Sequence, residues 1–263
     1  MGKKTIIDNP TVSNIVFHPR KTSMPKELDP NFKILKFQIR KNVIIGGFFY
    51  LHNPNYPTIL LFHRNGELAA DYKNLLSFFF WCPINLAVVD YRGYGFSSGE
   101  PFYTSLLVDA VPIYNEFHRW MRINNLRDSL FVQGRGLGST CASEIGSHNP
   151  KSLRGIIFDS GFASLYEIFT TLFRISSNKL TPESLDKFSN DTRIRKFKKP
   201  TLVIHGTDDW IIPFHQGELI FENLSKEIDK RLVPIEGANN TNIFNFEDEY
   251  RYPLKEFIND FGW

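Results

Sequence analysis

Short runs of apolar residues alternate with amphipathic stretches along most of the chain. Several of these runs are nearly continuous, which is typical of central strands whose two faces are both covered by helices. The first two runs lie close together and predict a hairpin. The predicted strands are 34–39, 42–51, 58–63, 84–90, 129–134, 153–159, 201–206 and 230–236.

The amphipathic stretches between these runs predict helices. They cover 68–81, 105–123, 139–148, 214–225 and about 246–261. Strands and helices that alternate in this way build a mostly parallel sheet with right-handed crossover connections. The pattern therefore predicts an α/β protein in which a central sheet of about eight strands is flanked by helices.

One insertion, residues 160–197, interrupts the alternation. Within it, 163–176 and 181–189 predict two short helices. An insertion beyond the carboxyl end of a strand lies over the ligand crevice of an open α/β sheet, so we expect a small helical lid; a mere surface excursion is the alternative. An apolar helical face in this segment is expected to pack against the domain rather than to form a substrate wall. Its residues are Leu165, Phe169, Leu172 and Phe173.

Length and composition set the expected domain organisation. The 263 residues are 42% hydrophobic and 22% charged, which is enough to bury a sizeable core, and α/β folds of this length commonly stay undivided. We therefore expect one domain over 31–263. Residues 1–30 are polar and contain prolines throughout, so they predict an irregular lead-in packed over the domain surface.

Charge and cysteine content argue against several classes of function. The formal net charge is only +3 and no stripe of basic and aromatic residues is present, so nucleic-acid binding is not expected. Neither Cys82 nor Cys141 stands in a metal-ligand or redox spacing, which indicates a reduced, cytoplasmic protein without a metal site. We find no secretory signal and no apolar run of membrane-spanning length, and we expect no cofactor.

The stretch FVQGRGLGSTCA, residues 131–142, has the pattern of a nucleophile elbow. Apolar strand residues lead into Gly134 and Gly138 and then into small residues that open a helix, as in the motif G-x-S-x-G. The third position of that motif carries the attacking hydroxyl, but here it is Gly136, which has no side chain. The stretch thus has the small residues that flank a serine nucleophile but lacks the serine itself.

Five segments that follow predicted strands match, in order and in sequence, the motifs of one known group of enzymes. They are FHRNGE (62–67), DYRGYGFSSGEP (90–101), GRGLGS (134–139), HGTDDWIIP (205–213) and EGANNTN (236–242). Together they resemble the serine hydrolases of the α/β-hydrolase superfamily, in which the corresponding segments read FHGNGE, DYRGYG, GRSLGS, HGxxD and GAGHND. The resemblance extends from about residue 30 to residue 261. It implies the α/β-hydrolase fold and the hydrolysis of ester or amide bonds.

The resemblance also implies roles for individual residues. Gly136 takes the nucleophile position, Asp209 the acid position and Asn240 the base position. Glycine has no hydroxyl and asparagine cannot relay a proton near neutral pH, so both the nucleophile and the base of the triad are missing. The backbone N–H groups of Asn65 and Leu137 are implied as oxyanion donors.

Neighbours of these positions are candidates for the crevice wall, namely His63, Arg64 and Arg135. Arg64 stands where the resembling family has glycine, so its cation is expected either to obstruct the oxyanion pocket or to hold an anion there. Glycine at 136 is expected to relax the turn, because a residue without Cβ adopts the strained backbone of an elbow at little cost. Cys141 is expected to be a small buried helix residue rather than a substitute nucleophile.

The paired loss favours a pseudoenzyme. Removal of the serine or the histidine from a triad lowers the rate by about six orders of magnitude. We therefore expect a protein that binds a small molecule or a protein partner through the former crevice. An esterase, thioesterase or peptidase-like enzyme that works with unusual groups is one alternative. A non-hydrolytic reaction on the same fold is the other.

Overall fold

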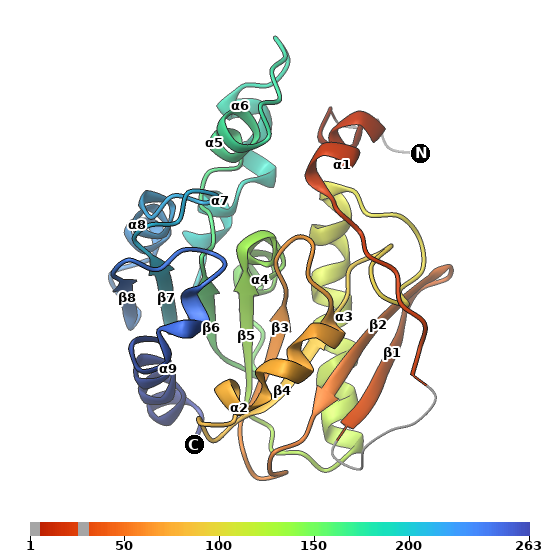
Figure 1. Cartoon of the computed structure of the whole chain (residues 1–263), viewed down its shortest axis with the longest axis vertical. Helices are drawn as coiled ribbons and strands as arrows, with labels where there is room; N and C mark the ends of the chain where they lie inside the picture. Colours follow the sequence, from red (N-terminus) through yellow and green to blue (C-terminus); the bar gives the residue numbers. More distant parts are fainter. Residues whose placement is uncertain (1–5, 26–31) are drawn as a thin grey trace.

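The computed structural model describes residues 6–25 and 32–263 and is built around one open sheet (Figure 1). Its strands are β1 (Phe32–Arg40), β2 (Val43–Tyr50), β3 (Thr58–Phe62), β4 (Asn85–Val89), β5 (Leu130–Arg135), β6 (Leu153–Asp159), β7 (Thr201–Gly206) and β8 (Lys230–Ile235). Within the described residues, the 8-stranded sheet has the order β1-β2-β4-β3-β5-β6-β7-β8. β2 runs antiparallel to both neighbours, and the pairs from β4 to β8 are parallel. These strands confirm the predicted α/β class.

Helices cover both faces of the sheet (Figure 1). One face carries α1 (Pro10–Val16), α3 (Tyr103–Ile123), α4 (Ser139–Ser147) and α8 (His215–Asn223), and the other carries α2 (Leu76–Phe79) and α9 (Glu247–Phe261). The predicted helix 68–81 is divided into a 3₁₀ helix, Ala69–Leu75, and the short α2. None of the helices in the two described ranges combines the length and apolar character needed to cross a membrane.

β3 shows why consecutive strand positions are apolar. Ile59 and Leu61 pack in the layer that contains α2 and α9, whereas Leu60 and Phe62 pack in the layer that contains α3 and α4. All four side chains are fully buried. Burial of such a side chain contributes about 1.5–3 kcal/mol relative to exposure. Two covered faces therefore select continuous apolar runs over alternation.

The inserted segment 160–197 consists of short helical turns. α5 (Leu165–Glu167) continues into a π-helical turn, Ile168–Leu172, and α6 (Pro182–Leu185) and α7 (Asn190–Ile194) follow. Helical turns are present where two helices were predicted, and α7 is an additional one. Figure 1 shows α5 and α6 rising beyond the sheet on one side and α1 on the other.

The expectation of an irregular N-terminal lead-in is wrong for residues 6–17. Pro10 occupies the first position of α1, where a helix needs no N–H, and Oδ1 of Asn9 accepts a hydrogen bond from N–H of Thr11 at 2.9 Å. A proline that suggested irregular structure thus begins a helix. Four apolar side chains of this segment are buried in the core; they are Ile7, Val12, Val16 and Phe17. Residues 1–5 and the expected boundary near residue 30 lie outside the described residues.

We predict that Val16→Ala lowers the free energy of unfolding by about 2 kcal/mol, because Val16 is fully buried in the core. Urea denaturation measures the change. Ile15→Ala is the matched control: it lies in the same helix, but Ile15 is 40% exposed, so its effect should stay below about 0.5 kcal/mol. Equally small losses in both variants would show that α1 does not contribute to the core.

Candidate functional site

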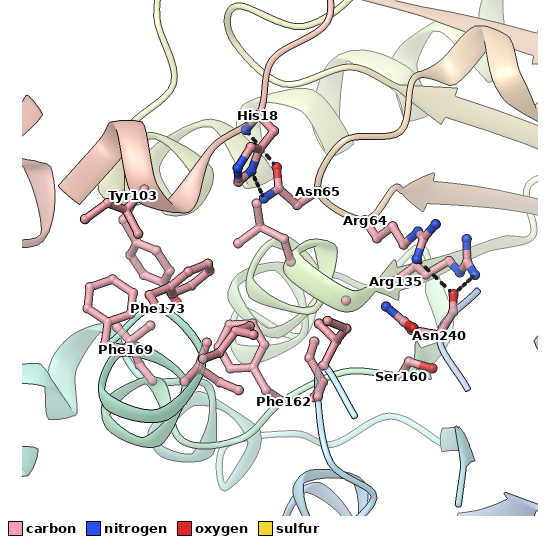
Figure 2. Close-up of a pocket in the computed structure, with 18 residues that line it drawn as sticks. His18, Arg64, Asn65, Tyr103, Arg135, Ser160, Phe162, Phe169, Phe173 and Asn240 are labelled. Atoms are coloured by element: carbon pink, nitrogen blue, oxygen red, sulfur yellow. Dashed lines mark hydrogen bonds between the residues drawn. The ribbon is translucent and has the colours of Figure 1, made fainter. Parts of the chain in front are cut away.

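A cavity of about 470 Å³ opens at the carboxyl edge of the sheet (Figure 2). Small-molecule sites occupy about 300–1,000 Å³. The apolar end is formed by Phe162, Leu165, Ile168, Phe169, Leu172 and Phe173 of the inserted segment. The polar end and the adjoining wall include His18, Arg64, Asn65, Arg135, Ser160 and Asn240.

Close backbone packing shapes the turn after β5. A Cβ atom on Gly138 would lie 2.0 Å from the carbonyl oxygen of Phe62, and one on Gly134 would lie 2.6 Å from the carbonyl oxygen of Gly138. Only glycine fits at either position. Gly136 has φ +51°, the left-handed conformation that a residue without Cβ adopts at little cost. The turn therefore presents a bare backbone to the cavity.

Arg64 fills the space beside Gly136. A Cβ atom on Gly136 would lie 3.1 Å from Cβ of Arg64, which is an unusually tight contact. Nε of Arg64 donates to Oε1 of Glu67 at 2.7 Å, and its Nη1 donates to the backbone carbonyl of Asn240 at 3.0 Å. The guanidinium is thus already paired. Of the two roles expected for Arg64, this geometry favours obstruction over holding an anion.

Arg135 forms the centre of a buried ionic network. Its side chain is only 4% exposed and forms an ion pair with Glu67, while its Nε lies 3.3 Å from Oδ2 of Asp159. Its Nη2 donates to the backbone carbonyl of Asn240 at 3.0 Å, and its guanidinium lies 4.3 Å from the centre of the Phe244 ring. Removing one partner from such a network leaves another charge buried and unpaired.

The pKa values of the two carboxyl groups beside Arg135 are shifted in opposite directions. Burial alone would raise the pKa of Glu67, but Arg135 and Arg64 outweigh burial and hold that pKa below its usual value. Burial raises the pKa of Asp159 despite its proximity to Arg135. The two arginines therefore keep Glu67 ionised, whereas burial favours the neutral form of Asp159.

Asp209 follows β7 and is 4% exposed. Its Oδ1 accepts hydrogen bonds from the N–H groups of Ile211 and Ile212, both at 2.9 Å. Its Oδ2 is buried and has no hydrogen-bond partner among the described residues; Nε2 of His205 lies 3.8 Å away and instead contacts the carbonyl of Ile212. One oxygen of the carboxylate therefore stabilises the turn after β7, and the other has no hydrogen-bond partner among the described residues.

Asn240 lies in the loop between β8 and α9 and reaches the polar end of the cavity (Figure 2). Its backbone carbonyl accepts hydrogen bonds from both Arg64 and Arg135. Its side-chain Oδ1 is buried and lacks a partner within the described part of the chain. Gly136 and Asn240 line the same cavity, which brings two of the predicted positions together.

The other predicted site residues have different surroundings. Asn65 and Leu137 line the cavity. The side chain of Asn65 donates to the carbonyl of Val16 at 2.6 Å and accepts from N–H of His18 at 3.0 Å, so it fastens the N-terminal segment. The oxyanion role of the two backbone N–H groups stays a prediction. His63 was expected in the crevice wall, but it is fully buried and is not among the described residues that line the cavity.

Several contributors to this site were missed in the sequence. Ile15 and His18 line the cavity because residues 6–25 fold against the domain, which the polar composition of the segment does not reveal. Ser160 lines it as well, with φ +47° directly after β6. The apolar face of the inserted segment was expected to pack against the domain, with a substrate wall as the less favoured alternative. All of its members line the cavity; they are Leu165, Phe169, Leu172 and Phe173.

Two side chains of the helix that follows Gly136, Ser139 and Cys141, are poorly suited to replace a serine nucleophile. Cys141 is buried, and burial raises the pKa of its thiol well above the usual value, so little thiolate forms. Oγ of Ser139 accepts a hydrogen bond from Nδ2 of Asn190 at 3.2 Å and is fully buried.

In the described ranges, His, Cys, Asp and Glu form no group of three or more that could hold a metal ion.

We predict that Arg135→Met lowers the free energy of unfolding by about 3–5 kcal/mol, because two carboxylates lose their buried partner. Chemical denaturation measures the loss. Arg231→Met serves as the control: its side chain is 29% exposed and pairs with Asp260 at the surface, so its effect should stay below about 1 kcal/mol. A loss for Arg135→Met no larger than that of the control would contradict a central role for the network.

Comparisons with known proteins agree with this architecture. A protein-family model described as serine aminopeptidase, S33, matches residues 53–190. The uncharacterized protein YfhR of Escherichia coli is 32% identical over 207 residues, which cover 76% of this chain and 69% of YfhR. Protein bem46 of Schizosaccharomyces pombe is 25% identical, with 75% of this chain and 67% of bem46 covered.

Human and archaeal proteins extend the comparison. The α/β-hydrolase domain-containing protein 17B of Homo sapiens is 26% identical over 78% of this chain and 68% of its own length. The esterase Pf2001 of Pyrococcus furiosus superposes with a TM-score of 0.71 at 17% identity over 99% of both chains, which shows a shared fold. The resemblance inferred from the motifs is confirmed. The chain belongs to the α/β-hydrolase superfamily, in the family described as serine aminopeptidase, S33.

Proposed function

We propose that this protein is a catalytically silent α/β hydrolase that binds a small, mainly apolar molecule in the cavity at the carboxyl edge of the sheet. One observation carries the proposal. The positions that the motifs assign to a catalytic triad hold Gly136, Asp209 and Asn240, and their surroundings fit a site without its hydroxyl and its imidazole.

The turn at Gly136 supports this proposal. It keeps the left-handed backbone that a nucleophile elbow requires, with φ +51°, but it offers no nucleophilic atom. A serine at position 136 would place its Cβ 3.1 Å from Cβ of Arg64, which is an unusually tight contact. Loss of the serine and gain of Arg64 are therefore sterically compatible with each other, whereas a serine beside Arg64 would be crowded.

The unused oxygen of Asp209 supports it as well. In an active triad, the carboxylate accepts a hydrogen bond from the imidazole that it orients. Here Oδ2 of Asp209 is buried without a partner among the described residues, a situation that costs about 1–3 kcal/mol. Asn240 supplies no proton acceptor of suitable pKa, and its carbonyl is held by two guanidinium groups.

The shape of the cavity favours a small molecule over a protein partner. It is concave and lined mostly by aromatic and aliphatic side chains, with a few polar groups at one end. We propose that the inserted segment 160–197 acts as a lid over this ligand, since its apolar residues form the wall. We further propose a reducing, cytoplasmic location, which the free thiols of Cys82 and Cys141 support.

A direct test of catalytic silence is incubation of the purified full chain with a fluorophosphonate probe and with short p-nitrophenyl esters. We expect neither covalent labelling nor turnover, because no activated hydroxyl faces the cavity. A serine esterase treated in parallel shows that the reagents are active. Stoichiometric labelling, or turnover that persists through further purification, would overturn the proposal in favour of an active hydrolase.

We predict that the triple variant Arg64→Gly, Gly136→Ser, Asn240→His hydrolyses p-nitrophenyl acetate, whereas Gly136→Ser alone restores little. The single variant lacks a base and places its Cβ 3.1 Å from Cβ of Arg64. The matched control carries alanine instead of serine at 136. The serine variant should exceed this control by about 10²-fold or more. Equal rates in the two triple variants would show that the nucleophile or base position is wrongly assigned.

A further inference from the structure

Two hydrogen-bonding atoms at the polar end of the cavity have no partner among the described residues. They are Oγ of Ser160 and Oδ1 of Asn240, and both atoms are buried. Ser160 is only 3% exposed, and its φ of +47° is uncommon for a serine. Buried polar atoms in folded proteins are nearly always paired, so an unpaired donor and acceptor in a cavity point to a ligand.

Both atoms lie around the same arginine. The backbone carbonyl of Asn240 accepts from Arg135 at 3.0 Å, and Ser160 directly follows Asp159, whose Oδ2 lies 3.3 Å from Nε of Arg135. Figure 2 shows Ser160 and the side-chain amide of Asn240 at the same end of the cavity, below the two arginines.

Both arginines at this end already have acidic partners. Arg64 and Arg135 are paired with Glu67, and Asp159 lies beside Arg135. Two guanidinium groups thus face two carboxyl groups. Among the described residues that line the cavity, a carboxylate ligand would meet no unpaired guanidinium and an ammonium ligand would meet no carboxylate. A carboxylate also brings only acceptors, so it cannot donate to Oδ1 of Asn240.

The rest of the cavity selects an apolar body. Phe162, Phe169 and Phe173 line it together with leucine and isoleucine side chains of the same segment. Ile15 and Ile212 add aliphatic surface from other parts of the chain. The apolar end lies away from the ionic network, as Figure 2 shows, so a ligand with one polar head and a hydrocarbon body matches both ends.

We propose that the cavity binds a neutral amphiphile whose head group carries both a hydrogen-bond donor and an acceptor, an alcohol or a primary amide, with its head between Ser160 and Asn240. This inference rests on the binding function proposed above and defines the chemical class of its ligand. The hydroxyl or amide donates to Oδ1 of Asn240 and exchanges a second hydrogen bond with Oγ of Ser160.

The test is isothermal titration calorimetry of the full chain at neutral pH with four compounds of equal chain length: 1-octanol, octanamide, octanoate and octylammonium. We expect the alcohol and the amide to bind at least about tenfold more tightly than the two ions, the effect of roughly one hydrogen bond. Equal affinity for all four, tighter binding of either ion, or no binding of any compound would overturn the assigned ligand class.

Two variants test which residue binds the head group of the ligand and which binds its hydrocarbon body. Ser160→Gly removes the hydroxyl while glycine tolerates the positive φ, so its Tm should not fall. Its affinity for octanamide should drop about five- to tenfold, because the head group loses one hydrogen bond. Phe173→Ala, in the apolar wall, should weaken all compounds that bind by a similar factor. A Ser160→Gly protein with unchanged octanamide affinity would overturn the inference.

The failure of this inference is distinguishable from failure of the proposed function. Catalytic silence is measured by the fluorophosphonate and ester assays, which do not depend on the affinity for octyl compounds. Covalent labelling of the chain would overturn catalytic silence whatever the calorimetry gives. An unlabelled chain that shows no head-group preference would overturn only the ligand class.

Discussion

The loops at the carboxyl edge of the sheet depend on the ion pairs and hydrogen bonds of the buried Arg135 guanidinium. It joins Glu67 from the loop after β3, Asp159 at the end of β6 and the carbonyl of Asn240 after β8. These loops are far apart in sequence, and the side chain of Arg135 contacts all three. A buried charge requires its partners, so the arginine fixes where each loop lies and thereby where the cavity opens.

Gly136 and Arg64 form a second, steric dependence at the same edge. The left-handed backbone at Gly136 carries little cost without a Cβ, and a Cβ there would lie only 3.1 Å from Cβ of Arg64. The guanidinium then pairs with Glu67 and Asn240. The wall beside Gly136 is thus formed by an arginine whose guanidinium is already paired.

The cavity is completed by two segments outside the repeating α/β pattern. The N-terminal segment supplies Ile15 and His18 and is fastened by Asn65, while the inserted segment supplies the aromatic wall. Neither belongs to the sheet and its crossovers. Their side chains give this site its apolar character, and the unpaired Ser160 and Asn240 give it a polar end.

The sequence by itself determined the sheet, the order of its strands along the chain and the loops that carry the site, because continuous apolar runs and glycine-rich turns are local signals. It also identified Gly136 and Arg64 as departures from a hydrolase pattern. Only the tertiary structure decided that α1 enters the core and that Ser160 and His18 face the cavity. Those outcomes depend on contacts between residues distant in sequence, which no local pattern of polarity encodes.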